Sequence, residues 1–405
     1  MSSCTLVCKR KYTTSLLVMI VMTSVLLDDA ASQSVTEERT SVGQRSSESI
    51  QFWYGDYQQF GHLGGHPQRW INVVGHAQPI GLVTLSYQLD DGPMNELAFR
   101  EDYKRIAADG DFNVELLVNE LTSGQHSLTV TAIYQDRQQQ RQMTFDVCHP
   151  PASGGGQNAS EQPALERAPR ENCGRVDHWP LPYHVRWNKQ KSITDAVQVV
   201  DGHWRLTPEG VRTVGHYYDR VLAIGDESWR DYEVRTRVKI HALTGPKSGG
   251  NTTNVTHCAI ALRWPGHDAD GNQPSVKWYP LGATAEFRLG SDLSECRWRI
   301  FDGNRQTHRE SPRRRQLHFE DWYALKHRVT THSDGSSVYQ VKLWPQSEQE
   351  PSEWDFQRIE PSDDVTCGSA LLIAHHADVT FGDIDAFPIP PSEMPNATLT
   401  PFNAD

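Results

Sequence analysis

Short segments in which apolar and polar residues alternate recur along most of the chain, between about residues 51 and 388. Clear examples are Val83–Leu89, His126–Ile133 and Tyr232–Ile240, and turn sequences such as Asp90-Asp91-Gly92 separate them. Alternation with a period of two is typical of strands that bury one face, whereas only Ser192–Val200 has a weak helical pattern. The chain is therefore predicted to be all-β.

Two blocks of strand-like sequence are separated by a stretch of different composition. Residues 51–147 contain short strands at close spacing, which predicts a β-sandwich. Residues 148–175 are rich in Pro, Gly and Ser and are typical of a linker. Residues 176–388 contain many antiparallel-looking strands, which predicts a second sandwich of the jelly-roll type. Residues 33–50 and 389–405 are predicted to be a flexible leader and a tail.

The first 32 residues have the layout of a secretory signal peptide. Lys9-Arg10-Lys11 precede an apolar run from Leu16 to Leu27, and small residues follow at a cleavage position after Ser32. The run is shorter than the roughly 20 residues that a membrane-spanning helix needs, and no later stretch reaches that length. We therefore expect a secreted or extracytoplasmic protein without an integral membrane span.

The charge balance limits the kinds of partner. The chain has 39 basic and 51 acidic residues, for a formal net charge of −12, and removal of the predicted signal shifts that charge to −13. An acidic protein is a poor candidate for binding nucleic acid as a whole. We therefore expect ligands among ions and extracellular polymers.

Five cysteines remain after removal of the predicted signal peptide, and an oxidising compartment favours their pairing. Cys148 and Cys173 flank the predicted linker, so a disulfide between them is expected to close that loop. Cys258, Cys296 and Cys367 lie in three separate strand-like segments, where one pair is feasible. The odd count leaves at least one thiol free or intermolecular. The lack of a Cys-x-x-Cys spacing argues against a zinc site.

Arginines fall on the polar side of several predicted strands. Arg288 alternates with Phe287, Arg299 with Trp298, and Arg263 with Leu262. If these strands belong to one sheet, their guanidinium groups form a basic groove that suits the carboxylates or sulfates of an anionic polysaccharide. The alternative is that each arginine pairs with a nearby Asp or Glu on a solvated strand.

Two parts of the chain resemble known families. The sequences "VVDGHWRLTPEGVRT", "YDRVLAIGDESWRDYEVRTRVKI" and "GSALLIAHHADVTFGDIDAF" resemble the opening and closing strands of a concanavalin A-like lectin/glucanase jelly roll, in its laminin-G-like or keto-glycoside-hydrolase-like branch. The sequence "LSYQLDDGP" with "DFNVELLVNELTSGQHSLTVTAIYQD" resembles the immunoglobulin-like modules of extracellular proteins. Such jelly rolls serve as lectins, glycosidases, polysaccharide lyases and adhesive modules, so the resemblance implies a fold more than an activity.

Candidate site residues follow from these patterns. The expected substrate-binding residues are Arg263, Arg288, Arg299, Lys277 and Trp278. The expected catalytic residues, if the protein is an enzyme, are His267, Tyr279, His375 and Glu286. Arginine with His or Tyr could carry out β-elimination on a uronate, and jelly-roll lyases commonly use that set. A glycoside hydrolase needs two carboxylates, of which Glu286 is the best single candidate.

The resemblance also implies a structural calcium ion. Asp383 and Asp385 in "FGDIDAF", with Asp201 in "VVDGHW", occupy positions similar to those that hold calcium in relatives of this fold. The alternative is that all three are ordinary turn aspartates. Together the sequence predicts a secreted protein that binds an anionic polysaccharide, with a lyase or glycoside hydrolase and an adhesive surface protein as alternatives.

Overall fold

The computed structural model describes residues 49–61, 68–102, 104–148, 179–215, 218–244, 256–276, 281–304 and 306–390. The predicted signal peptide, leader and tail lie almost wholly outside these residues, as does the linker after Cys148. Within them the protein is all-β, as predicted, with only three short 3-10 helices: η1 (Val118–Glu120), η2 (Trp187–Lys189) and η3 (Ile193–Asp195). The weak helical pattern at Ser192–Val200 corresponds to η3 followed by a strand. No helix in the described part of the chain is long and apolar enough to cross a membrane.

The N-terminal half contains two sheets. The strands of the first are β1 (Ile50–Phe52), β3 (Trp70–Ala77) and β6 (Asp111–Leu117), and those of the second are β2 (Tyr57–Gly61), β8 (Gln138–Cys148), β7 (Gly124–Tyr134), β4 (Leu82–Leu89) and β5 (Met94–Glu96). Pairing is antiparallel except between β2 and β8, which run parallel. Alternate residues of both sheets, such as Val73, Val114, Leu128 and Phe145, are fully buried in one core.

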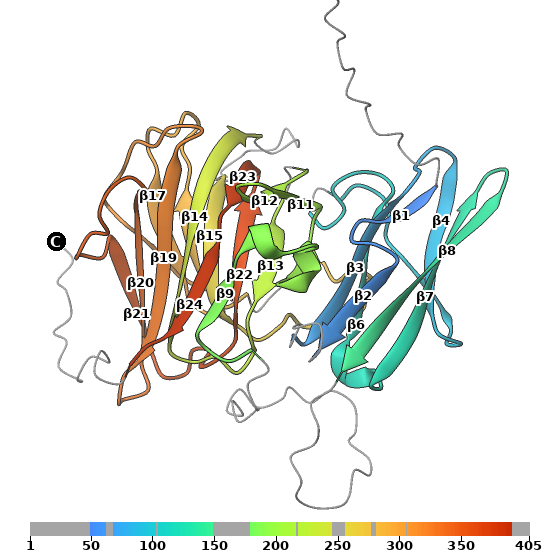
Figure 1. Ribbon diagram of the computed structural model, residues 1–405, viewed down its shortest axis with the longest axis horizontal. Coiled ribbons are helices and arrows are strands. Elements are labelled where there is room, and N and C mark those ends of the chain that lie inside the picture. Colours follow the sequence, from blue (N-terminus) through green and yellow to red (C-terminus); the bar gives the residue numbers. More distant parts are fainter. Residues whose placement is uncertain are drawn as a thin grey trace, which may run out of the picture. The chain divides into compact units, whose positions relative to one another are not determined.

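The C-terminal half contains a seven-stranded and a nine-stranded sheet (Figure 1). The strands of the seven-stranded sheet are, in order, β10 (Gln198–Asp201), β13 (Arg220–Ile224), β22 (Ser369–His375), β15 (His257–Trp264), β16 (Ala283–Arg288), β17 (Arg297–Phe301) and β18 (His308–Glu310). The strands of the nine-stranded sheet are β11 (Trp204–Thr207), β12 (Gly210–Thr213), β23 (Ala377–Phe381), β14 (Tyr232–Leu243), β19 (Trp322–Thr331), β20 (Ser337–Pro345) and β21 (Phe356–Glu360). In addition, β24 (Ile384–Pro388) pairs with β14, and β9 (Tyr183–Val185) pairs with β24.

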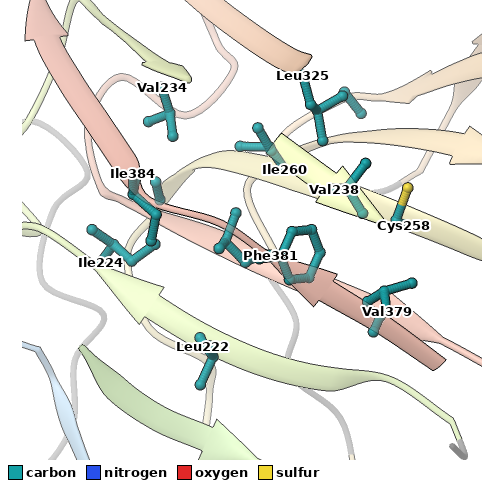
Figure 2. Close-up of a cluster of buried hydrophobic side chains, with 14 of the residues drawn as sticks. Leu222, Ile224, Val234, Val238, Cys258, Ile260, Leu325, Val379, Phe381 and Ile384 are labelled. Carbon is teal, nitrogen blue, oxygen red and sulfur yellow. The ribbon is translucent and has the colours of Figure 1, made fainter. Parts of the chain in front are cut away.

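Apolar side chains of these two sheets meet in one core (Figure 2). Leu222 and Ile260 come from the seven-stranded sheet, and Val238, Leu325 and Phe381 come from the nine-stranded sheet; all are at most 1% exposed. Because alternate residues point to opposite faces of a strand, each sheet has a second face that points away from this core. The sequence alternation predicts which residues those outer faces carry.

The division into two domains stays a prediction, because Glu48–Asp405 forms one compact unit. Several contacts join the N-terminal strands to the seven-stranded sheet. The Asn113 side chain donates a hydrogen bond to the Val200 carbonyl, and the Gln198 amide donates one to Asn72 Oδ1. The immunoglobulin-like topology of the N-terminal sheets likewise stays a prediction.

The cysteines differ in state. Cys258 and Cys296 are buried and free, whereas Cys367 is disulfide-bonded. None of the pairs open among these three cysteines therefore forms. Cys173 and the side chain of Cys148 lie outside the described residues, so the disulfide between them stays a prediction.

Candidate functional site

The outer face of the seven-stranded sheet carries a polar cluster. Strand register places His375 of β22 opposite His257 of β15, and His257 opposite Arg288 of β16. One row further, Glu286 of β16 lies opposite Arg299 of β17. The set that we call the His–Arg cluster consists of Asp219, His257, Glu286, Arg288, Arg297, Arg299, Glu310 and His375. Their neighbours Cys258, Phe287 and Trp298 point the other way, into the core.

Two histidines and an aspartate lie at one end of the His–Arg cluster. Asp219 immediately precedes β13, whose first residue pairs with Ala374, so its carboxylate is next to His375. The Asp219 Oδ1 to His375 Nδ1 distance is 2.7 Å, and the Asp219 Oδ1 to His257 Nε2 distance is 4.0 Å. The two imidazole rings stack with centroids 4.5 Å apart and an interplanar angle of 6°. All three residues are buried.

Three arginines lie at the other end of the His–Arg cluster and share two carboxylates. Arg299 Nε donates to Glu286 Oε2 at 2.8 Å, and Arg297 Nε donates to Glu310 Oε2 at 2.9 Å. Arg288 also pairs with Glu310. The arginine side chains are 16–23% exposed, whereas the Glu286 side chain is fully buried. The Glu310 side chain is 29% exposed, so the accessible part of this end consists of three guanidinium groups and one carboxylate.

Electrostatic interactions within the arginine end shift the pKa values of its members. Burial, followed by repulsion from Arg299, lowers the pKa of Arg288, although Glu310 opposes that shift. Burial alone would raise the pKa of Glu310, but attraction to Arg288 and Arg297 lowers it overall. The direction at Arg288 therefore reflects burial first and the neighbouring Arg299 charge second.

Arg263 does not lie in the His–Arg cluster, contrary to the prediction from alternation. Its φ of +59° and the register shift between Ala261 and Trp264 mark a bulge in β15. The fully buried guanidinium donates hydrogen bonds to Ser337 Oγ and Thr331 Oγ1. Simple alternation fails because the bulge interrupts the period of two. Arg263 therefore connects strands in the interior and is not placed to bind a substrate.

His267 also lies away from the His–Arg cluster. It is fully buried, stacks on Trp70 with ring centroids 4.6 Å apart, and has Nε2 3.1 Å from Glu115 Oε2. Glu115 in turn pairs with the buried Arg105. Burial would raise the pKa of Glu115, but its interactions with Arg105 and His267 lower it well below its usual value. This arrangement is a structural contact between the two halves of the chain, not a catalytic histidine in a groove.

The three aspartates expected to bind calcium do not converge. Asp201 is fully buried between Arg105 and Arg220, at 2.6 and 3.1 Å. Asp385 pairs with His184 and Arg186, both at 2.6 Å. Asp383 Oδ1 accepts a hydrogen bond from the Trp187 backbone N–H. Calcium requires six to eight oxygen ligands, and these carboxylates are instead paired with cations or backbone donors. The observed residues therefore do not fit the calcium prediction.

The outer face of the nine-stranded sheet differs in composition. What we call the Trp–cation face consists of Arg235, Arg237, Lys239, Trp322, Lys326, Arg328, Lys342, Trp344 and Trp354 from β14, β19, β20 and the segment before β21. The strands β14, β19, β20 and β21 are neighbours in this order in the sheet (Figure 1). The Arg237 guanidinium lies 4.3 Å from the centre of the Trp322 ring, and the Lys342 ammonium lies 4.7 Å from that of Trp354. Glu350 bridges Lys326 and Lys342 at 2.8 and 2.7 Å.

Comparisons with known proteins give distant similarities. No protein-family model matches the chain, and no curated protein sequence matches it. The exoplasmic/lumenal domain of VIP36 in its Ca²⁺/Man2-bound form is 14% identical, with 48% of this chain and 83% of that chain covered and a TM-score of 0.30. The alginate lyase Aly36B is 11% identical, with 52% and 98% covered and a TM-score of 0.33.

An endo-β-1,4-mannanase from Thermotoga petrophila is 11% identical, with 27% of this chain covered and a TM-score of 0.21. The match spans only 22% of the mannanase. Similarities this distant assign neither a family nor an activity.

Sequence reasoning identified some members of the His–Arg cluster and missed others. Glu286, Arg288, Arg299 and His375 were candidates, whereas Lys277, Trp278 and Tyr279 lie outside the described residues. Asp219 and His257 were not recognised as candidates, because their neighbours come from strands distant in sequence. Alternation in Tyr232–Ile240 places Arg235, Arg237 and Lys239 on one polar face, but the tryptophans and cations of the neighbouring strands were missed. The alternation of Trp322, Lys326 and Arg328 with Tyr323 and Leu325 could have revealed them.

Proposed function

We propose that the protein binds an anionic polysaccharide through the arginine end of the His–Arg cluster. Arg288, Arg297 and Arg299 would provide the contacts to carboxylate or sulfate groups. Planar guanidinium groups suit such ligands because two parallel N–H donors match two oxygens. The proposal is consistent with a secreted protein, whose ligands are extracellular polymers.

The observation that carries the proposal is the surplus of guanidinium groups over carboxylates at one partly exposed position. Glu310 is divided between Arg288 and Arg297, and Glu286 serves Arg299. Arg288 Nε is buried and has no hydrogen-bond partner among the described residues, so a ligand would have to bind the other guanidinium nitrogens. An anionic ligand would supply oxygens for the partly exposed guanidinium groups and offset the repulsion between Arg288 and Arg299. Paired strands lie about 4.8 Å apart, so a single extended polymer can contact both β16 and β17.

The Trp–cation face is a weaker candidate despite its larger number of cations. Arg237 and Lys239 both lie over Trp322, and Arg235 and Lys342 lie over Trp344. Trp344 is only 2% exposed. Ring faces that the protein's own cations cover are not available to stack on sugar rings. This face therefore supports the sheet.

Polysaccharide elimination is the second candidate function, favoured by the hydrogen bond between Asp219 and His375. A carboxylate that holds an imidazole at 2.7 Å fixes its orientation, as a general base requires. Arg288, on the same face, would neutralise the uronate carboxylate. Hydrolysis through Glu286 is less favoured, because that side chain is fully buried and paired with Arg299. A glycosidase acid must reach the scissile bond.

Calorimetric titration of the full chain with a polyuronate, a sulfated glycan and a neutral glucan tests the proposal. We expect binding to at least one anionic polymer, with an affinity that falls as salt rises, and weaker binding to the neutral glucan. Equal affinity for the neutral polymer, or no binding to any anionic one, would contradict the proposal. Ultraviolet absorbance of the same mixtures detects the unsaturated uronate ends that only elimination creates.

A further inference from the structure

We propose that Asp219, His257 and His375 form a binding site for a divalent transition metal, specifically Zn²⁺. Each residue offers one ligand atom, and these atoms all lie within 4.8 Å of one another. The side chains of the three residues are 9%, 3% and 8% exposed. The inference does not depend on the proposed glycan binding, because it rests on three side chains at the other end of the cluster.

The observed separations bracket those of a bound zinc ion. Zinc binds His nitrogen and carboxylate oxygen at about 2.0–2.2 Å in a tetrahedron, which places neighbouring ligand atoms roughly 3.3 Å apart. Asp219 Oδ1 lies 2.7 Å from His375 Nδ1 and 4.0 Å from His257 Nε2. All three ligand atoms lie within 4.8 Å of one another, so small side-chain movements would bring them to coordination distance. No strand needs to change register.

Metal binding would change the histidines in two defined ways. His375 Nδ1 must present its lone pair to the metal, so the proton shared with Asp219 moves to Nε2 or leaves to solvent. The two imidazoles must also tilt out of their 6° stack, because lone pairs in parallel planes do not converge on one ion. Two metal–nitrogen bonds would offset the loss of that stacking contact.

The chemistry of the three donors selects the metal class. Two imidazole nitrogens and one carboxylate suit zinc and its first-row neighbours, whereas calcium and magnesium prefer oxygen ligands. Glu286 Oε1 lies 3.7 Å from His257 Nε2, where it is close enough to hydrogen-bond a metal-bound water. Three protein ligands with a water in the fourth position is a recurring zinc arrangement. A metal here would make His375 a ligand and so exclude it as the general base of an elimination.

The test measures Zn²⁺ stoichiometry and affinity by titration of the metal-free full chain. The test variants are His257→Ala and His375→Ala, and the matched control is His241→Ala. His241 is also mostly buried beside a carboxylate, with Nδ1 2.8 Å from Glu320 Oε1, but it belongs to the nine-stranded sheet. We expect one tight site in the wild type and the control, and about 100-fold or greater weakening in both test variants. Circular dichroism and thermal unfolding without metal verify that each variant folds.

Co²⁺ provides a second readout that needs no variant. Co²⁺ bound to the wild type should show the strong visible absorption of a tetrahedral site with nitrogen ligands, and added Zn²⁺ should abolish it. Zinc affinity that is equal in the wild type and both test variants would overturn the proposal. Absence of the cobalt absorption together with absence of tight zinc binding would also overturn it, and the triad would then be a hydrogen-bonded cluster alone.

Discussion

The two outer faces of the C-terminal sheets carry similar numbers of charged groups but arrange them differently. On the nine-stranded sheet, cations lie over tryptophan rings, and Glu350 ties Lys326 to Lys342. On the seven-stranded sheet, arginines share two carboxylates and lie beside two histidines and an aspartate. On the nine-stranded sheet, the rings and carboxylates of the protein itself interact with the cations. On the seven-stranded sheet, arginine donors and the His and Asp ligand atoms can also bind an external ligand.

The comparison shows that counting cations on a strand does not locate a binding site. Arg237 and Arg288 both alternate with apolar residues, yet their surroundings differ. Arg237 covers the ring of Trp322, while Arg288 is lowered in pKa by burial and by Arg299. The two faces differ in whether the folded protein itself supplies enough interaction partners for each cation.

Replacement of Trp344 by alanine should give the largest effect on stability. This side chain is 2% exposed, and large aromatic-to-alanine changes in a core typically lower the free energy of unfolding by about 3–5 kcal/mol. Urea denaturation measures the change, with Trp354→Ala as the more exposed comparison. Polysaccharide affinity of the folded fraction should not change. A stable Trp344→Ala protein that has lost binding would reverse the roles of the two faces.

Acid should release the bridge that Glu350 makes on the Trp–cation face. Burial alone would raise the pKa of Glu350, but hydrogen bonds from Lys326 and Lys342 lower it from 4.5 to about 2. A lowered folded-state pKa stabilises the protein above pH 4.5, and that contribution disappears as the pH falls toward 2. Glu350→Gln should therefore lower stability by about 1 kcal/mol at pH 7 and by almost nothing at pH 2.

Glu348→Gln, in the same connection between β20 and β21, is the matched control for this pH series. Thermal unfolding of the three proteins between pH 7 and pH 2 provides the measurement. If the difference in stability between the wild type and Glu350→Gln is the same throughout that pH range, the ionised Glu350 carboxylate does not stabilise the face.

The last prediction in this order is that two buried thiols do not react with an alkylating reagent in the native protein. Burial raises the pKa of Cys258 to about 12 and that of Cys296 to about 11, so both stay protonated and shielded at neutral pH. Mass spectrometry after iodoacetamide treatment should find them unmodified in the native protein and modified in denaturant. Rapid labelling of Cys258 in the native protein would mean that the Cys258 side chain lies on the outer face of β15. His257, the next residue, would then point toward the core.

Local alternation predicted much of the fold and one end of the site. Glu286, Phe287 and Arg288 alternate as expected, because an unbroken strand keeps its period of two. Arg263 departs from its expected face because β15 bulges there, and Gly282 and Gly368 approach that bulge so closely that a Cβ on either would meet backbone at 2.4 and 2.2 Å. No single-strand pattern reveals a bulge whose neighbours come from distant segments.

The group formed by Asp219, His257 and His375 could not be predicted from the sequence, for a related reason. Asp219 and His375 are 156 residues apart, and β22 inserts between β13 and β15 although it follows both in the chain. Motif spacing detects ligands that lie within one turn or hairpin. The lack of a Cys-x-x-Cys spacing was therefore no evidence against this kind of site. Strand order, which the sequence does not encode locally, created it.

The most direct test of the central claim compares polysaccharide affinity in Arg288→Ala and Arg237→Ala. Both variants remove one arginine from a polar outer face, so net charge changes equally. If the His–Arg cluster binds the polymer, Arg288→Ala should weaken binding by about 1.5–3 kcal/mol, the range for hydrogen bonds to charged groups, and Arg237→Ala should change it little. Equal loss in both variants, or loss in Arg237→Ala alone, would contradict the assignment of binding to the seven-stranded sheet.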